Sequence, residues 1–219
     1  MKDQGATIVI TQDAEPSNKL VSLIRGNIAS VLIAAILALF IRTFIVQTFK
    51  IPSGSMEDTL AIGDYILVNK FIYGTKVPFT NQRILRIREP RRGDVIVFQF
   101  PKDPSQDYIK RVIGLPGDRI LIRDKKVYVN GLAYENPREV HKDGGNISGV
   151  SSPRDNLEVG VVPPGACFVM GDNRDNSYDS RFWGFVKDGN IRGLAFLKHW
   201  SWDKENRQVR WERIFRPIE

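Results

Sequence analysis

The chain has 219 residues, of which 42% are apolar and 10% aromatic, so it can fold around a sizeable core and is not of the disordered class. Its single cysteine, Cys167, excludes an intramolecular disulfide and any zinc site that needs two or more cysteines. The formal net charge is +7, with lysines and arginines scattered along the chain. This charge is compatible with an anionic membrane surface or with nucleic acid, and it does not choose between them.

A strongly apolar segment lies near the start of the chain. The stretch from Ile28 to Val46 contains 19 residues with Arg42 as its one charge. A spanning helix needs ~20 residues, and an arginine near a helix end can reach the head groups, so we expect a membrane helix over residues 26–47. The alternatives are a buried core helix, which would be apolar along one stripe only, and a cleaved signal peptide, which needs a small-x-small site. Basic residues flank both ends, so charge leaves the orientation open.

The chain changes character after residue 62, where short β-like runs are separated by glycine, proline and aspartate. The clearest runs are "DYILVNKFIYG", "DVIVFQF", "YIKRVIG", "RILIRDKKVYVNG" and "ACFVMGD". No long amphipathic helix is expected after residue 60. Residues 135–160 are rich in Gly, Ser, Asn and charge, which indicates a loop-rich insert between more regular parts. The sequence therefore predicts a mainly β unit behind the apolar segment.

The tripeptide Ser53-Gly54-Ser55 has two compatible interpretations. Ser55-x-x-Asp58 fits a capping box, which would start a helix at Ser55. Alternatively, Ser55 is an exposed nucleophile on a tight turn whose backbone amides can bind an oxyanion.

A serine nucleophile needs a base, and this chain is poor in histidine. Only His141 and His199 are available, and neither lies in a motif-like setting. A lysine can replace histidine if burial lowers its pKa by several units. Lys110 is the candidate, because in a strand it shares a face with Tyr108 and Val112. The alternative is that Lys110 is ion-paired on an edge strand.

The third notable stretch is "GDNRDNSYDSR", residues 171–181, which packs aspartate, asparagine, arginine and serine into eleven positions. It could be a solvated loop or a cation-binding loop. An EF-hand is excluded because the required glutamate at the twelfth position is missing.

In combination, "IPSGSM", "YIKRVIGLPGD" and "GDNRDNSYDSR" behind an apolar segment resemble the type I signal peptidases, membrane-anchored serine proteases that remove secretory signal peptides. The resemblance extends from the apolar segment to about residue 195. It implies a mainly β fold with an inserted smaller β region, here at about 119–163, after one transmembrane helix. The implied organisation is a cytoplasmic tail over residues 1–25, the membrane helix, and an extracytoplasmic catalytic domain over residues 48–219.

The resemblance also implies roles for particular residues. By position, Ser55 matches the nucleophile and Lys110 the general base, while Ser53 matches a side-chain donor to the oxyanion. Four further positions match supporting residues of the family: Ser177, which would orient the lysine, the ion pair Asp179 and Arg181, and Asp172. Asp58, Lys187 and Leu194 depart from residues often seen in the family, but none of them carries the chemistry.

The expected function is therefore signal-peptide removal through a Ser/Lys dyad and an acyl-enzyme, at the cell (inner or plasma) membrane. The expected partners are secretory preproteins with small residues before the cleavage site and the lipid bilayer. No cofactor, metal or nucleic acid is expected, and the protein is expected to be a monomer. Two alternatives remain, which are a soluble Ser/Lys protease of the self-cleaving type and a non-catalytic anchored β module that binds signal peptides.

Overall fold

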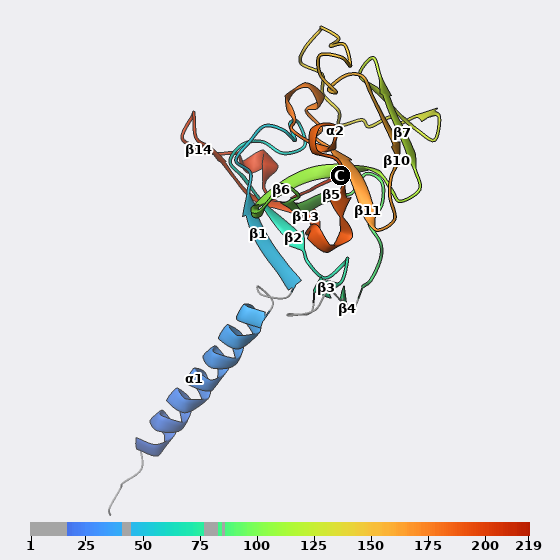
Figure 1. The fold of residues 1–219 in the computed structure, drawn as a ribbon. Helices are drawn as coiled ribbons and strands as arrows, with labels where there is room; N and C mark the ends of the chain where they lie inside the picture. Colours follow the sequence, from blue (N-terminus) through green and yellow to red (C-terminus); the bar gives the residue numbers. More distant parts are fainter. Residues whose placement is uncertain (1–16, 41–44, 77–82, 85) are drawn as a thin grey trace, which may run out of the picture. The chain divides into compact units, whose positions relative to one another are not determined.

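The computed structural model describes residues 17–40, 45–76, 83–84 and 86–219, and the chain divides into two compact units, Met1–Ile41 and Arg42–Glu219. The first unit contains helix α1, Ser17–Phe40 (Figure 1). Within the described residues, no helix combines the length and the hydropathy of a membrane span. Most of the predicted tail, residues 1–16, and residues 41–44 of the predicted membrane helix lie outside the described residues.

The predicted end of the membrane helix at residue 47 is wrong. Val46 and Gln47 belong to strand β1, Val46–Lys50, which pairs antiparallel with β2. The physical reason is that the partner strand supplies the backbone hydrogen bonds of these residues, so the local apolar composition does not decide their conformation.

The second unit is mainly β, as the sequence predicts. Its remaining elements are β2 (Asp64–Asn69), β3 (Thr75–Lys76), β4 (Arg83–Ile84), β5 (Val95–Phe100), β6 (Asp103–Gly114), β7 (Arg119–Arg123), β8 (Lys126–Val129), β9 (Leu132–Ala133), β10 (Leu157–Val161), β11 (Ala166–Met170), η2 (Arg174–Asn176), α2 (Ser180–Trp183), β12 (Val186–Lys187), η3 (Asp188–Asn190), β13 (Ile191–Asp203), β14 (Gln208–Val209), η4 (Trp211–Arg213) and β15 (Arg216–Pro217). Among the described residues after position 60, the longest α-helix is the four-residue α2.

The large sheet has the strand order β1-β2-β13-β5-β6-β11-β12, and β14 and β15 also pair with β13. A second sheet of four strands, β10-β7-β8-β9, is built from residues 119–161, and β3 and β4 form a small hairpin. The strand β6 is central to the site, because it lies between β5 and β11.

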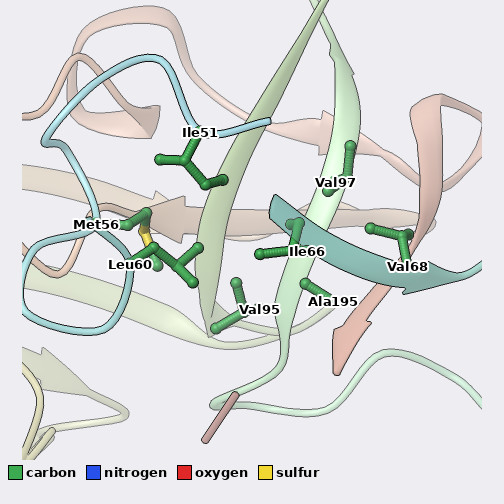
Figure 2. Packing of buried hydrophobic residues seen from close by; sticks show 8 residues of the cluster. All are labelled: Ile51, Met56, Leu60, Ile66, Val68, Val95, Val97 and Ala195. Carbon is green, nitrogen blue, oxygen red and sulfur yellow. The ribbon is translucent and has the colours of Figure 1, made fainter. Parts of the chain in front are cut away.

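Three clusters of buried apolar side chains form the core. One joins β2, β5 and the loop that follows β1 (Figure 2). A second includes Ile96 and Phe98 of β5 and Val169 of β11. The third joins β7 and β8 of the second sheet to Phe168 and Met170 of β11. The second sheet is therefore packed against the large sheet through shared apolar contacts.

Candidate active site

The predicted nucleophile lies in the loop between β1 and β2, residues 51–63, which we call the Ser55 loop. Three apolar side chains of this loop, Ile51, Met56 and Leu60, are buried in the core cluster with strands β2 and β5 (Figure 2). Ser55 itself is half-buried. Because Met56 directly follows Ser55, the burial of its side chain restricts the position of the serine backbone.

The helix start predicted at Ser55-x-x-Asp58 is wrong, because residues 53–60 form bends and turns. A helix would need successive carbonyl groups to accept hydrogen bonds from N–H groups four residues ahead. Leu60 does donate to the carbonyl of Met56 at 2.8 Å, but the carbonyl of Ser55 accepts the backbone N–H of Asn173 at 3.2 Å. The tertiary contact thus replaces the bond that a helix would have required.

Lys110 lies in β6, and its side chain contacts Ser55 directly. Its Nζ is 2.7 Å from Ser55 Oγ and 2.9 Å from the carbonyl oxygen of Ile109, and the side chain is 4% exposed. The amine also lies over the ring of Tyr108, at 5.6 Å from the ring centroid. The alternative of an ion-paired lysine is wrong, since no carboxylate of the described residues lies within salt-bridge distance of Lys110. Lys110 pairs with β5 on one side only, because the pairing of β6 with β11 begins at Arg111.

The environment of Lys110 favours the neutral amine. Burial lowers the pKa of Lys110 to about 8, although the charges of Asp179 and Asp172 act against this shift. A substantial fraction of the amine is therefore unprotonated at mildly alkaline pH, which is the form that can accept a proton from a serine hydroxyl.

The aspartates of residues 171–181 form ion pairs with arginine and lysine side chains of this protein. Asp172 accepts two hydrogen bonds from the guanidinium of Arg111, both of 2.7 Å, and one of 2.6 Å from the hydroxyl of Thr59 in the Ser55 loop. Asp175 pairs with Lys125 at 3.0 Å. The stretch is therefore neither a solvated loop nor a free carboxylate cluster. It is a buried network that joins β6 to the Ser55 loop.

Asp179 and Arg181 form a second buried ion pair. Two hydrogen bonds of 2.8 Å join the guanidinium to the carboxylate, which also accepts the N–H of Gly171 at 3.0 Å. Burial acts to raise the pKa of Asp179, but Arg181 holds this pKa below its usual value. The pair therefore stays ionised at neutral pH.

Gly171 lies close to both Ser55 and Ser177. The Cα of Gly171 faces the carbonyl of Ser55 and the hydroxyl of Ser177 so closely that a Cβ would overlap both. Ser177 is buried, but its hydroxyl is not among the hydrogen-bond partners of Lys110, which are Ser55 and Ile109. The role of Ser177 in orienting the lysine stays a prediction.

A cleft of about 420 Å³ opens beside the two central residues. It is lined by Pro52, Ser53, Gly54, Ser55, Gln106, Asp107, Tyr108, Ile109, Lys110, Asn176 and Tyr178. Ser53 is exposed in it. The pairing of β6 with β11 ends at Arg111, so residues 107–110 pair with β5 on one side only. Residues 106–110 line the cleft.

Neither histidine belongs to this site. His141 lies between Glu139 and Asp175, at 3.7 and 3.5 Å. His199 packs edge-on to the ring of Tyr65. Neither lines the cleft, so the structure does not assemble a Ser-His-Asp triad at Ser55.

Two residues of the site were not identified from the sequence. Arg111 is the partner of Asp172, and Asn173 binds the Ser55 loop. Both lie inside the quoted motifs, directly after Lys110 and Asp172. Their position inside these motifs could have marked them as site residues. Local patterns do not reveal which residue each one contacts, because the contacting residues are more than 50 positions apart in the chain.

The chain is similar to known proteins. The family model described as "Signal peptidase, peptidase S26" matches residues 24–200. The chain is 41% identical to Signal peptidase I of Pseudomonas aeruginosa, over 76% of this chain and 69% of that protein. It is 38% identical to Signal peptidase I of Aquifex aeolicus, over 81% of this chain and 84% of that protein. A crystal structure of a signal peptidase I from Enterococcus faecalis matches with 34% identity and a TM-score of 0.40, covering 49% of this chain and 97% of that chain.

The family model covers more than half of the chain, and relatives well above 30% identity cover about three quarters of it or more. On this basis the chain belongs to the signal peptidase family, and it is a type I signal peptidase, a serine protease that removes signal peptides from preproteins.

Proposed function

We propose that Ser55 and Lys110 perform the hydrolysis as nucleophile and general base. The observation that carries this proposal is the 2.7 Å contact between Lys110 Nζ and Ser55 Oγ, made by a lysine whose pKa burial lowers to about 8. When the amine is neutral, the direction of this hydrogen bond can reverse, so that the serine hydroxyl donates and the lysine accepts. This arrangement prepares the hydroxyl for attack.

In the first step, Ser55 Oγ would bond to the carbonyl carbon of the scissile peptide while its proton moves to Lys110 Nζ. The negative charge on the substrate oxygen would be held by the backbone N–H of Ser55 and the hydroxyl of Ser53. The bond to nitrogen then breaks, the leaving amine takes the proton from Lys110, and an ester to Ser55 remains. Water, deprotonated by Lys110, attacks this ester, and the proton returns to Ser55 Oγ as the acyl group leaves.

We assign supporting roles to six neighbouring residues. Asp172, with Arg111 and Thr59, would hold the Ser55 loop against β6. The ion pair Asp179–Arg181 would hold the backbone at Gly171, which touches the carbonyl of Ser55. Ser177 would orient Lys110, and its burial beside Gly171 supports this role.

The substrate would bind as an extended peptide along residues 106–110 of β6. These residues carry backbone groups whose second side is not taken by β11, and a peptide strand can pair with such an edge. The cleft lies between this edge and the Ser55 loop, and the expected substrates have small side chains near the scissile bond. Secretory preproteins with an A-x-A-like site have this chemistry.

We further propose that the enzyme acts at the membrane surface, as a single-pass protein anchored by the part of the apolar segment that precedes β1, with the catalytic domain on the extracytoplasmic side. The family is membrane-associated in bacteria, and large apolar side chains of α1 are exposed, among them Val31, Ile33 and Ile36. Nine residues separate Val46 from Ser55, so the nucleophile lies at most ~30 Å from the end of the apolar segment.

The catalytic unit also exposes aromatic side chains suited to a membrane surface. Trp200 and Trp211 pack edge to face at 6.2 Å between ring centroids, and Trp211 is 72% exposed. Trp202 is 39% exposed on the same strand as Trp200. Tryptophan rings favour the boundary between lipid and water.

The deciding experiment is cleavage of a preprotein in detergent by the wild type and by Ser55→Ala. The proposal requires that cleavage by Ser55→Ala falls to background while its thermal unfolding is unchanged. A serine-reactive acylating inhibitor should label the wild type and leave Ser55→Ala unlabelled. Residual cleavage above a tenth of the wild-type rate would show that another residue attacks the substrate.

A further inference from the structure

The Ser55 loop is held at two successive carbonyl groups by one residue, Asn173. The side-chain amide of Asn173 donates to the carbonyl of Gly54 at 3.1 Å. Its backbone N–H donates to the carbonyl of Ser55 at 3.2 Å. The two bonds hold the peptide groups on either side of the Cα of Ser55.

The first of these bonds has a consequence for the backbone N–H of Ser55. The carbonyl of Gly54 and the N–H of Ser55 belong to one peptide group, which is planar and trans. The C=O bond and the N–H bond of this group therefore point in opposite directions. The Gly54 carbonyl accepts two hydrogen bonds, one from the backbone N–H of Glu57 within the Ser55 loop at 3.2 Å and one from Asn173, which is the donor from outside the loop. Donors that hold the carbonyl on one side set the direction of the N–H on the other side. We propose that Asn173 is a positioning residue, which aims the Ser55 N–H into the cleft as an oxyanion donor by holding the Gly54 carbonyl.

Asn173 is itself held firmly enough for this role. It is 1% exposed, and it lies between Asp172 and Arg174. The carbonyl of Asp172 accepts the N–H of Val140 at 2.8 Å, and the N–H of Arg174 donates to the carbonyl of Val140 at 3.0 Å. The residues on both sides of Asn173 are thus bonded to another segment, so the asparagine cannot simply follow the Ser55 loop.

Within the described part of the chain, the side chain of Asn173 makes its hydrogen bond to the Ser55 loop. Its Nδ2 reaches the Gly54 carbonyl, whereas its Oδ1 is buried without a hydrogen-bond partner among the described residues. A buried amide oxygen without a partner lowers stability. Its amide donor, in contrast, meets the one carbonyl whose direction matters for the oxyanion. This arrangement favours a functional role over a purely stabilising one.

The inference rests on the proposed Ser55 and Lys110 mechanism, and it predicts a loss in kcat rather than in KM. Removing an oxyanion donor outright lowers the rate ~10²–10³-fold. A donor that is present but poorly aimed should lose less, so we expect Asn173→Ala to lower kcat about 10- to 100-fold with KM within about threefold of wild type. The measurement is steady-state cleavage of a preprotein by the full chain in detergent.

The matched control is Asn156→Ala. Asn156 also donates from its side-chain amide to a backbone carbonyl, that of Ile147, at 3.0 Å, but it lies in the loop before β10 and does not line the cleft. The kcat of the Asn156→Ala variant should stay within about twofold of wild type. An equal loss in both variants would assign the effect to general loosening and overturn the proposal.

Three further readouts separate positioning from mere structural support. The pH at which kcat/KM is half-maximal should stay at the wild-type value in Asn173→Ala, because the burial of Lys110 is not changed. A shift of this pH toward the usual lysine pKa would instead show that the site has opened to water.

The second readout is inhibitor binding. The affinity for a peptide boronate, which forms a tetrahedral adduct with serine, should fall in parallel with kcat, while the affinity for the cleaved signal peptide should not. The loss of kcat in the double variant Asn173→Ala, Ser53→Ala should be smaller than the product of the losses in the two single variants, because both residues act on one oxyanion.

Asn173→Asp keeps the size of the side chain but removes its amide donor. This variant is the test if Asn173→Ala does not fold. It should lose at least as much kcat as is expected of the alanine variant. Wild-type kcat in either folded variant would overturn the inference and leave the dyad intact. Cleavage by Ser55→Ala would overturn the proposed function itself, so the two failures are distinguishable.

Discussion

Lys110 and Arg111 are adjacent in β6, but they lie in opposite electrostatic surroundings. Lys110 Nζ contacts the hydroxyl of Ser55 and the carbonyl of Ile109, whereas Arg111 makes two hydrogen bonds of 2.7 Å to the carboxylate of Asp172. Successive residues of a strand point to opposite faces, so a separation of one residue is enough to give one cation an acidic partner and leave the other without one. The cation that must lose its proton is the one without the partner.

This difference predicts the pH dependence of cleavage. Because burial lowers the pKa of Lys110 to about 8, kcat/KM should rise with pH through an acid limb near 8 and level off above it. The neutral amine is the active form, so activity is lost as the pH falls below this value. Lys110→Arg should be inactive at every pH tested, since a guanidinium keeps its proton. An active arginine variant would exclude the dyad.

Ser53→Ala should lower kcat by ~10²-fold or more and leave KM nearly unchanged, because an oxyanion donor acts mainly in the transition state. Steady-state kinetics on a preprotein measure both constants. Ser151→Ala, at an exposed position outside the cleft, is the control and should behave as wild type. A change in KM alone would favour a turn-forming role for Ser53.

Gly171→Ala should impair cleavage strongly, because a Cβ at this position would overlap the carbonyl of Ser55 and the hydroxyl of Ser177. Relief of this overlap would displace the Ser55 loop from Lys110. We expect a fall in kcat of at least about tenfold, comparable with the loss from a small misplacement of a reacting group. Gly189→Ala is the control, since a Cβ there meets open space. A Gly171→Ala variant with wild-type kcat would show that the loop can move without consequence.

Arg181→Met should destabilise the catalytic unit by about 3–5 kcal/mol, because it leaves the fully buried carboxylate of Asp179 without its partner. Arg192→Met removes an exposed ion pair with Asp107 and should change stability by less than about 1 kcal/mol. Urea unfolding at pH 7 compares the two. Since Arg181 holds the pKa of Asp179 below its usual value, the stabilisation is present at neutral pH and lost as the pH falls through that lowered pKa. The difference between wild type and Arg181→Met should therefore narrow in acid.

The apolar segment should remain in the mature protein and retain it in membranes during alkaline extraction. The motivation is the run from Ile28 to Val46, which is not followed by a small-x-small cleavage site. The checks are N-terminal sequencing and extraction at high pH of the full chain, with a variant that lacks residues 1–41 as the control. A mature N-terminus beyond residue 46 would contradict the anchor.

Local patterns in the sequence were sufficient for the class of fold, and they selected the two residues that we propose as the dyad. The short runs of β-forming residues predicted a mainly β unit, and this was confirmed. Ser55 and Lys110 were selected from their motifs, and the structure places them 2.7 Å apart. The same patterns failed at Val46 and at the capping box of Ser55, where a tertiary partner supplies the backbone hydrogen bonds.

The sequence determined which chemical groups are available, since a chain with one cysteine and two histidines has few ways to activate a serine. Only the tertiary structure decided which of those groups meet. The strand order β5-β6-β11 buries Lys110 without an acidic partner and places Arg111 within hydrogen-bond distance of Asp172. It also brings Asn173 to the carbonyl of Gly54, which lies 119 residues earlier in the chain. The physical reason is that a pKa and a hydrogen bond depend on distance and burial in space, whereas residue type and periodicity report only local conformation.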